Sequence, residues 1–331
     1  MKVLLIGGTG LISTGIVKHL LTRGVEVTMF NRGERENHFP RSVHTIKGDR
    51  NDPASLAQCH QQKFDVVIDM FCFTAEQTRT LIDTFKNRCE QIIFCSTVCT
   101  YGAKIPSHVL IDETFPQEPV SDYGKNKVVC EKMLLESHAK GDFNTTIIRP
   151  SYTYGPGRSM LDNLEGDAVA WDRIEKGLPV LCAGDGLGLW VATHRDDCGK
   201  LFAYAAQNKK TYGESYNATR DRIFTWDDYY HEAARALGHE VKLLHLPASM
   251  IVKADPQRFA LLREITRYHG AYSSAKAKRD VPEFVCEIDF VDGFKEAMDD
   301  VKRRKEWRSC ENDKVYESLI KTAASIGILP E

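Results

Sequence analysis

Short apolar runs alternate with helical patterns through the first half of the chain. The runs predict strands at 2–6, 26–30, 43–46, 65–69, 91–95 and 144–149. The segments between them predict helices at 11–21, 53–61, 74–85 and 121–135. Strands that alternate with helices predict a parallel sheet with right-handed crossovers. The chain is therefore predicted to be an α/β protein.

A glycine-rich turn joins the first strand to the first helix. It reads Gly7-Gly8-Thr9-Gly10-Leu11-Ile12-Ser13, and Gly24 follows the helix where a left-handed cap is expected. Strand, turn, helix and strand within about 30 residues is the pattern of a dinucleotide-binding unit. Glycines let backbone N–H groups approach a pyrophosphate at a helix N-terminus, where the helix dipole favours anions. The third glycine of this pattern is replaced by Ser13, a small residue that this position should tolerate.

The end of the second strand bears on the choice of cofactor. An NAD-binding protein usually carries Asp or Glu there, to bind the ribose hydroxyls. This chain has Asn31-Arg32-Gly33. A guanidinium suits a 2′-phosphate, which favours NADP, whereas Glu34 and Glu36 lie close enough to keep NAD as the alternative.

A candidate catalytic group lies between Ser96 and Lys127. Tyr123 and Lys127, at i and i+4, share one face of the predicted helix, for which Ser121 is the expected N-cap. An unperturbed tyrosine has a pKa of about 10 and is a poor base at neutral pH. A nearby cation favours the phenolate and lowers that pKa, which makes the phenol a usable acid or base. A catalytic role for this pair is supported by Ser96-Thr97, which ends the fifth strand, because ligands bind at the carboxyl ends of parallel strands.

The regular alternation stops after residue 157. A helix is predicted at 167–176, and a returning segment at 190–197 leads to a helix that ends near residue 206. We therefore predict a Rossmann domain of doubly wound parallel sheet at 1–157, to which 191–221 return. A smaller, mostly helical substrate lobe is predicted at 158–190 and 222–331.

Composition excludes several classes of protein. The net charge is −2, so no bulk field recruits nucleic acid or an anionic membrane, and no apolar run is long enough to span a bilayer. The chain starts directly in a strand, with no room for a signal peptide. The ten cysteines lack Cys-x-x-Cys spacing, which predicts neither a zinc site nor a disulfide framework. These observations predict a reduced cytoplasmic protein without a metal.

Taken together and in this order, the motifs resemble those of the extended short-chain dehydrogenase/reductase superfamily, the NAD-dependent epimerases and dehydratases. The matching segments span about residues 1 to 220: the glycine turn, Ser96-Thr97, Tyr123-x-x-x-Lys127, Arg149-Pro150 with Tyr154-Gly155-Pro156-Gly157, Gly184-Asp185-Gly186 and His194-Arg195-Asp196-Asp197. The segments at 31–33 and 48–50 also resemble a subgroup that includes chloroplast RNA-binding relatives.

The resemblance implies roles for individual residues. Tyr123 would be the acid/base, Lys127 would hold the nicotinamide ribose, and Thr97 would hydrogen-bond the substrate oxygen. Substrate contacts are expected from Thr97, Arg158 and Asn163. The cofactor-binding residues are expected to be Gly7, Thr9, Gly10, Leu11, Ile12, Asn31, Arg32, Asp49, Arg50, Asp69, Tyr123, Lys127, Pro150 and Tyr152. The family also implies a homodimer packed through the helices that follow Thr74 and Tyr123.

Two departures from the family's motifs reduce the number of reactions expected of this chain. Dehydratases place Asp-Glu directly after the threonine, whereas this chain has Val98-Cys99 and lacks the acid for dehydration. Cys99 falls where some epimerases and the GDP-fucose synthases carry an acid/base cysteine, but their partner base falls on Leu161. Cys99 is therefore either a catalytic residue or a small residue below the nicotinamide.

The resulting prediction is an NAD(P)-dependent epimerase of a nucleotide sugar that acts through a transient keto intermediate. An NADP-dependent carbonyl or alcohol oxidoreductase is the enzymatic alternative, and a non-catalytic RNA-binding or scaffold relative is the third. The expected partner is a small-molecule substrate, with no nucleic acid or membrane.

Overall fold

The computed structural model describes residues 1–34, 39–103 and 110–328, and these form two compact units. The first unit comprises Met1–Thr153, Arg195–Asp221 and Tyr272–Glu287, and the second comprises Tyr154–His194, Arg222–Ala271 and Ile288–Glu331. Among the residues in these described ranges, no helix combines the length and apolar character needed to cross a membrane.

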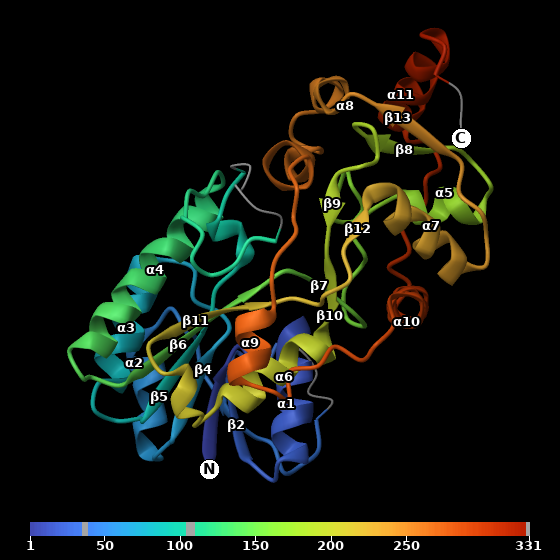
Figure 1. The fold of residues 1–331 in the computed structure, drawn as a ribbon. Helices are drawn as coiled ribbons and strands as arrows, with labels where there is room; N and C mark the ends of the chain where they lie inside the picture. Colours follow the sequence, from blue (N-terminus) through green and yellow to red (C-terminus); the bar gives the residue numbers. More distant parts are fainter. Residues whose placement is uncertain (35–38, 104–109, 329–331) are drawn as a thin grey trace. The chain divides into compact units, whose positions relative to one another are not determined.

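Seven parallel strands form the sheet of the first unit, in the order β11-β6-β5-β4-β1-β2-β3 (Figure 1). The strands are β1 (Lys2–Ile6), β2 (Glu26–Asn31), β3 (His44–Lys47), β4 (Val66–Asp69), β5 (Gln91–Cys95), β6 (Asn144–Pro150) and β11 (Glu214–Ala218). The strand order reverses beside β1, so this sheet has the topological switch point at which doubly wound folds bind ligands. The predicted Rossmann sheet is confirmed, with β11 added at its edge.

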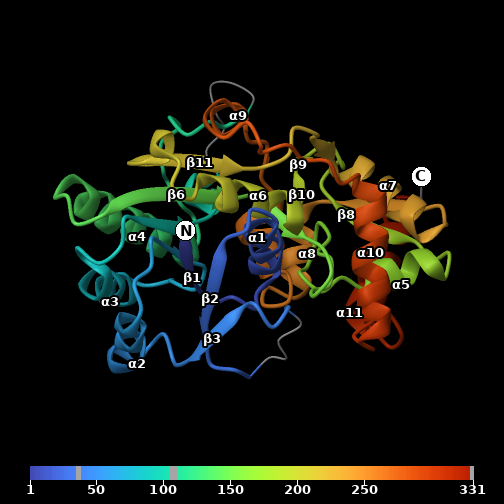
Figure 2. The ribbon, with the colours of Figure 1, turned by 90° about the horizontal axis from the view of Figure 1, so that it is seen from below.

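Helices cover both faces of this sheet, because strand side chains point alternately to opposite faces. Val3 and Leu5 pack with α1 (Leu11–Thr22) and α6 (Arg195–Ala205). Leu4 and Ile6 belong to the opposite core, with side chains from the helices of the other face. Those helices are α2 (Pro53–Ala57), α3 (Ala75–Phe85) and α4 (Asp122–Ala139), and Figures 1 and 2 show them on the face opposite α1 and α6.

The ends of these helices follow the capping residues in the sequence. Thr74 caps α3 by accepting a hydrogen bond from the Gln77 N–H at 3.2 Å, and Ser121 caps α4 by accepting from the Gly124 N–H at 3.1 Å. Gly24 has φ of +67°, as expected for the left-handed residue after α1. The predicted helix at 53–61 is instead α2 followed by a 3₁₀ turn at Gln58–Gln61.

Two glycines allow α1 and α6 to cross at close range. A Cβ atom on Gly15 would lie 2.3 Å from the carbonyl oxygen of Arg195, and one on Gly199 would lie 2.4 Å from the carbonyl carbon of Gly15. Neither helix could approach the other with a larger residue at these positions. Close packing therefore depends on Gly15, two residues after the position where the nucleotide-binding pattern has its third glycine.

The boundary of the first unit differs from the predicted one at 272–287. This segment was assigned to the substrate lobe, but α9 (Ala275–Asp280) packs beside β11 in the first unit. The Tyr216 hydroxyl donates to Asp280 at 3.0 Å, and the Lys276 ammonium lies 2.6 Å from the Glu214 carboxylate. A short amphipathic helix far along the chain carries no local signal of the strand that it covers.

The second unit is mostly helical, as predicted, and also contains short strands. Strands β8 (Val180–Ala183) and β13 (Leu243–Leu246) pair in parallel, and β9 (Leu189–Trp190) pairs antiparallel with β12 (Phe224–Thr225). Its helices are α5 (Ala170–Glu175), α7 (Trp226–Leu237), α8 (Ala248–Ala254), a π-helix at Leu262–Thr266, α10 (Phe290–Arg303) and α11 (Lys314–Ser325). The helix predicted at 167–176 is α5, which is shorter in the structure.

The remaining elements are short. They are the strands β7 (Tyr152–Tyr154) and β10 (Ala192–His194), which pair with each other, and two 3₁₀ turns of the first unit, at Val98–Thr100 and Lys209–Thr211.

Candidate functional site

The glycine turn after β1 has a geometry that only small residues permit. Gly7 has φ of +84°, and a Cβ atom on Gly8 would lie 2.6 Å from the side chain of Met29. The Ser13 hydroxyl donates to the Gly7 carbonyl at 2.8 Å and closes the turn from the helix side. Gly10 is the N-cap of α1 and has no side chain that could cap it. The first N–H groups of α1 are therefore left for an anion, as a pyrophosphate requires.

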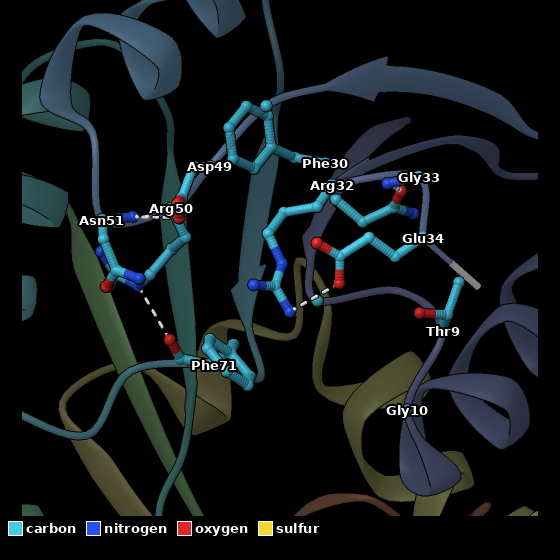
Figure 3. Close-up of a pocket in the computed structure, with 13 residues that line it drawn as sticks. Thr9, Gly10, Phe30, Arg32, Gly33, Glu34, Asp49, Arg50, Asn51 and Phe71 are labelled. Carbon is cyan, nitrogen blue, oxygen red and sulfur yellow. Dashed lines mark hydrogen bonds and ion pairs between the residues drawn. The ribbon is translucent and has the colours of Figure 1, made fainter.

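A pocket of about 280 Å³ opens at the carboxyl ends of the strands beside this turn (Figure 3). Its lining comes from the turns after β1, β2, β3 and β4, which meet at the switch point. The lining residues are Gly7, Thr9, Gly10, Phe30, Asn31, Arg32, Gly33, Glu34, Gly48, Asp49, Arg50, Asn51 and Phe71. Seven of the residues predicted to bind the cofactor line it: Gly7, Thr9, Gly10, Asn31, Arg32, Asp49 and Arg50. Leu11 and Ile12 form the start of α1 next to it.

The turn after β2 presents both a cation and a carboxylate to the pocket. The Asn31 side-chain oxygen accepts from the Gly33 N–H at 2.9 Å, which fixes the turn. The exposed guanidinium of Arg32 lies 2.9 Å from the carboxylate of Glu34, and Figure 3 shows this pair within the pocket. Glu36, the other acid considered for ribose binding, lies outside the described residues.

Arg50 and Asp69 are bound to each other. The Arg50 Nη2 atom donates to Asp69 at 2.7 Å, and its Nε atom donates to the Phe71 carbonyl at 2.8 Å. Asp69 also accepts from the Phe71 N–H at 2.9 Å and is fully buried. Burial lowers the pKa of Arg50, but the Asp69 carboxylate outweighs this and raises it. This geometry does not support the prediction that Asp69 contacts the cofactor, because its carboxylate fixes the loop after β4.

Lys127 is held in a buried site of backbone carbonyls and aromatic rings. Only 1% of the residue is exposed, and its Nζ atom donates to the Cys72 carbonyl at 2.8 Å and to the Cys95 carbonyl at 2.6 Å. The same atom lies 4.7 Å from the ring centroids of both Phe73 and Phe94. These contacts fix the ammonium beside the end of β5.

Tyr123 lies one helical turn before Lys127 and is 43% exposed. Its ring centroid is 5.8 Å from the Lys127 Nζ atom. A Cβ atom on Gly124 would lie 2.6 Å from the Cys99 carbonyl oxygen, so glycine lets the first turn of α4 pack directly on the Val98–Thr100 turn. The tyrosine is therefore positioned beside the end of β5.

Thr97 and Cys99 occupy that strand end. The Thr97 hydroxyl oxygen accepts from the Cys99 N–H at 3.1 Å, and the hydroxyl is also hydrogen-bonded to the Cys99 thiol. The Cys99 side chain is partly exposed, and burial of the thiol raises its pKa. Cys99 is thus a neutral thiol at neutral pH, which disfavours a role as a base.

Behind these residues lies a buried ion pair that the sequence analysis missed. The Glu131 carboxylate accepts from Arg149 Nε at 3.0 Å and Nη2 at 2.6 Å, from Gln117 at 2.8 Å and from the Ser96 hydroxyl. Glu131 and Arg149 are 1% and 5% exposed. Burial lowers the pKa of Arg149, but Glu131 outweighs it and raises that pKa above the usual range. The pair fixes α4 to β6 two turns after Tyr123.

A phenol extends this network to the edge strand. The Tyr101 hydroxyl accepts from Arg149 at 2.9 Å and donates to Asn217 on β11 at 2.8 Å. Burial raises the pKa of Tyr101 to about 12, so it stays a neutral donor. The spacing of Tyr123, Lys127 and Glu131, four residues each, is a sequence signal for one shared helix face that could have suggested Glu131.

The remaining predicted residues have different surroundings. Pro150 is the last residue of β6, and Tyr152 follows it, partly exposed, in β7. Arg158 is exposed, whereas Asn163 is 1% exposed and its side-chain oxygen accepts from the Ala183 N–H at 2.6 Å. This hydrogen bond ties the buried Asn163 side chain to β8.

Known proteins resemble the chain over most of its length. Residues 3–219 match the family described as the NAD dependent epimerase/dehydratase family. A 2′-dehydrokanamycin reductase from Streptomyces kanamyceticus is 23% identical over 86% of this chain and 80% of its own. A chloroplast stem-loop binding protein of 41 kDa from Arabidopsis thaliana is 26% identical over 88% of this chain and 77% of its own.

Among solved structures, a UDP-glucose 4-epimerase from Thermotoga maritima shares the fold. Its TM-score is 0.74 at 17% identity, over 92% of this chain and 100% of its own. The chain therefore belongs to the NAD-dependent epimerase/dehydratase family of extended short-chain dehydrogenase/reductase enzymes.

Proposed function

We propose that the protein is an epimerase that inverts a carbinol centre of a nucleotide sugar and keeps its cofactor bound between turnovers. The observation that carries this proposal is the Lys127 ammonium, fixed by two carbonyls one helical turn from an exposed Tyr123. This arrangement suits reversible proton transfer at a secondary alcohol. The Thermotoga maritima protein of the same fold, a UDP-glucose 4-epimerase, supports the choice of substrate class.

The chain's own residues perform the proton transfers. The Tyr123 phenolate takes the hydroxyl proton of the sugar, and the Lys127 ammonium stabilises the negative charge of that phenolate. A bound nicotinamide would supply the acceptor and the donor of the carbinol hydride. Thr97 donates a hydrogen bond to the same oxygen, which becomes the carbonyl of the keto intermediate. After the keto sugar has turned over in the site, Tyr123 would give the proton back to the same oxygen, and the carbinol would form with the opposite configuration.

Arg32 supports NADP as the cofactor. β2 ends in the neutral amide of Asn31, and among the described residues the exposed carboxylate of Glu34 is the charge partner of Arg32. A 2′-phosphate would replace that carboxylate as the partner of the guanidinium. Arg32→Ala should weaken NADPH binding about 10- to 100-fold, since a charge-assisted hydrogen bond contributes about 1.5–3 kcal/mol. NADH binding should be unchanged, and Glu34→Gln is the matched variant that should strengthen NADPH binding.

A keto-sugar reductase is the second candidate, and the reductase from Streptomyces kanamyceticus favours it. The two reactions differ in what happens to the cofactor. An epimerase should carry a stoichiometric nucleotide through purification and show no net redox change. A reductase should exchange its cofactor and consume the reduced form when a keto-sugar is added.

The first experiment is to denature the purified protein, identify any released nucleotide by mass and absorbance, and measure binding of added NAD(H) and NADP(H). Retained nucleotide supports the epimerase, and an empty site that binds NADPH supports the reductase. Tyr123→Phe and Lys127→Met should each lower turnover about 10²- to 10⁴-fold, whereas Cys99→Ser should leave it unchanged. Loss of turnover in Cys99→Ser would instead assign Cys99 a catalytic role.

The Arabidopsis thaliana relative directs a third test. Filter binding to structured RNA at increasing salt should give no affinity at physiological salt, because this chain carries no net positive charge. Tight, steeply salt-dependent RNA binding without cofactor binding would contradict the enzymatic proposal. The predicted homodimer through α3 and α4 is part of the same proposal, and sedimentation of the purified chain tests it.

A further inference from the structure

Three side chains with metal-binding atoms converge in the second unit, outside the pocket and the catalytic residues. Cys182 lies on β8 and His245 on β13, and these two residues are direct partners in the parallel pairing of the strands. Asp227 is the second residue of α7, whose N-terminus lies beside them. Figure 1 shows β8 and β13 next to each other in this unit.

The three candidate ligand atoms are close enough to share one ion. The Cys182 Sγ, an Asp227 carboxylate oxygen and a His245 ring nitrogen all lie within 4.8 Å of one another. His245 Nε2 and Asp227 Oδ1 are 2.9 Å apart. Ligand bonds to zinc of about 2.0–2.3 Å place the donor atoms of a tetrahedral site about 3.5 Å apart. Shifts of about an ångström in these side chains would therefore complete three corners of a tetrahedron.

The local backbone makes room for the carboxylate. A Cβ atom on Gly186 would lie 1.9 Å from Asp227 Oδ1, and the Asp227 N–H donates to the Gly186 carbonyl at 3.1 Å. An aspartate in the first helical turn is also favoured by the helix dipole and the Thr225 capping box. That benefit explains the charge of Asp227. The buried Cys182 thiol faces the same carboxylate and is hydrogen-bonded to it, so a cation at this point would have the sulfur, the carboxylate and the imidazole as neighbours.

The burial of Cys182 favours metal binding over a role as a nucleophile. Cys182 is fully buried, whereas His245 and Asp227 are partly exposed, so an ion could arrive from the solvent side and reach the sulfur last. A nucleophilic cysteine would have to be reached by its substrate. Burial, together with the charge of Asp227, also raises the pKa of Cys182, which leaves the metal-free thiol unreactive.

We propose that Cys182, Asp227 and His245 bind one Zn²⁺ ion, with the fourth position open to water or another ligand. One thiolate, one imidazole and one carboxylate in tetrahedral geometry is a ligand set that zinc prefers. The ion would link β8, β13 and the start of α7. The spacing rule that predicted no zinc site considers ligands that are close in sequence, and these three come from separate elements.

The test is metal binding by the full-length chain after treatment with a chelator. Zinc is titrated in competition with a chromophoric chelator, and Co²⁺ is used as a spectroscopic probe. One ion per chain is expected, and the Co²⁺ complex should show the charge-transfer absorption of a thiolate ligand. Cys182→Ser, Asp227→Asn and His245→Gln should each weaken zinc binding by more than about 100-fold. Loss of a residue that only orients a metal ligand weakens metal binding by at most about 100-fold, so a larger effect identifies a ligand.

Two variants serve as matched controls in the same unit. Cys310→Ser removes another buried thiol, and His239→Gln removes an exposed imidazole after α7; both should bind zinc as the wild type does. Circular dichroism of each variant verifies folding. A wild-type Co²⁺ complex without thiolate absorption would overturn the proposal without reference to any variant. Equal zinc affinity in the wild type and the three ligand variants would also overturn it.

Discussion

Replacing Glu131 tests whether the buried network behind the catalytic helix supports the first unit. In Glu131→Gln, the Arg149 guanidinium stays buried and loses its charge partner, and two of the four hydrogen-bond donors meet an amide N–H₂ instead of an oxygen. Removing one partner of a buried ion pair costs about 3–5 kcal/mol. For a unit of this size, that corresponds to a fall of roughly 6–20 °C in the melting temperature.

The assay is thermal and urea unfolding followed by circular dichroism, with Glu136→Gln as the control on the exposed side of the same helix. The control should change stability by less than about 0.5 kcal/mol. The double variant Glu131→Leu/Arg149→Met should recover most of the loss, because no uncompensated charge stays buried. A Glu131→Gln variant as stable as the control would refute the reasoning. It would mean that water or a rearranged side chain satisfies Arg149.

Two further predictions concern other parts of the fold. Gly15→Ala should lower the melting temperature and reduce the free energy of unfolding by about 1–3 kcal/mol, because the new Cβ atom would lie 2.3 Å from the Arg195 carbonyl oxygen. In an open helix, alanine would instead be more stable than glycine, so a higher melting temperature would contradict the close crossing of α1 and α6. Burial raises the pKa of Asp172, but hydrogen bonds led by the Cys310 N–H at 2.7 Å outweigh it and hold that pKa well below its usual range. The carboxylate therefore stabilises the second unit above about pH 4 and loses this effect as the pH falls. Asp172→Asn should cost about 1.5–3 kcal/mol at pH 7, with the difference from wild type shrinking toward pH 2, whereas a pH-independent difference would contradict the assignment.

The parts of the site that could be predicted from sequence are those with a local pattern. The glycine turn, the Thr74 and Ser121 caps and the residues at the carboxyl ends of the strands follow from short-range spacing, and the strand order then brings them together. Predicting the ion pair between Arg50 and Asp69 required knowing that the loop after β3 folds over the end of β4. A charged residue at a strand end can face a ligand or another charge, and the sequence does not distinguish these.

Contacts between distant segments account for what was missed. Glu131 and Arg149 belong to elements whose packing depends on the register of α4 on the sheet. The same holds for the return of 272–287 to β11 and for the convergence of Cys182, Asp227 and His245. Each depends on side chains that approach only after the sheet has formed.

The discontinuous first unit has a consequence for how the chain folds during synthesis. The last segment of that unit ends at Glu287, after most of the second unit has been translated. At about 5–20 residues per second, the segment between Ala218, the end of β11, and Ala275, the start of α9, takes on the order of several seconds to be translated. During this interval β11, the edge strand of the sheet, lacks the helix that covers it, so the nascent first unit exposes the side chains of Tyr216 and Ala218, which are buried in the complete fold. Chaperone binding to ribosome-bound chains should therefore be concentrated between these two points.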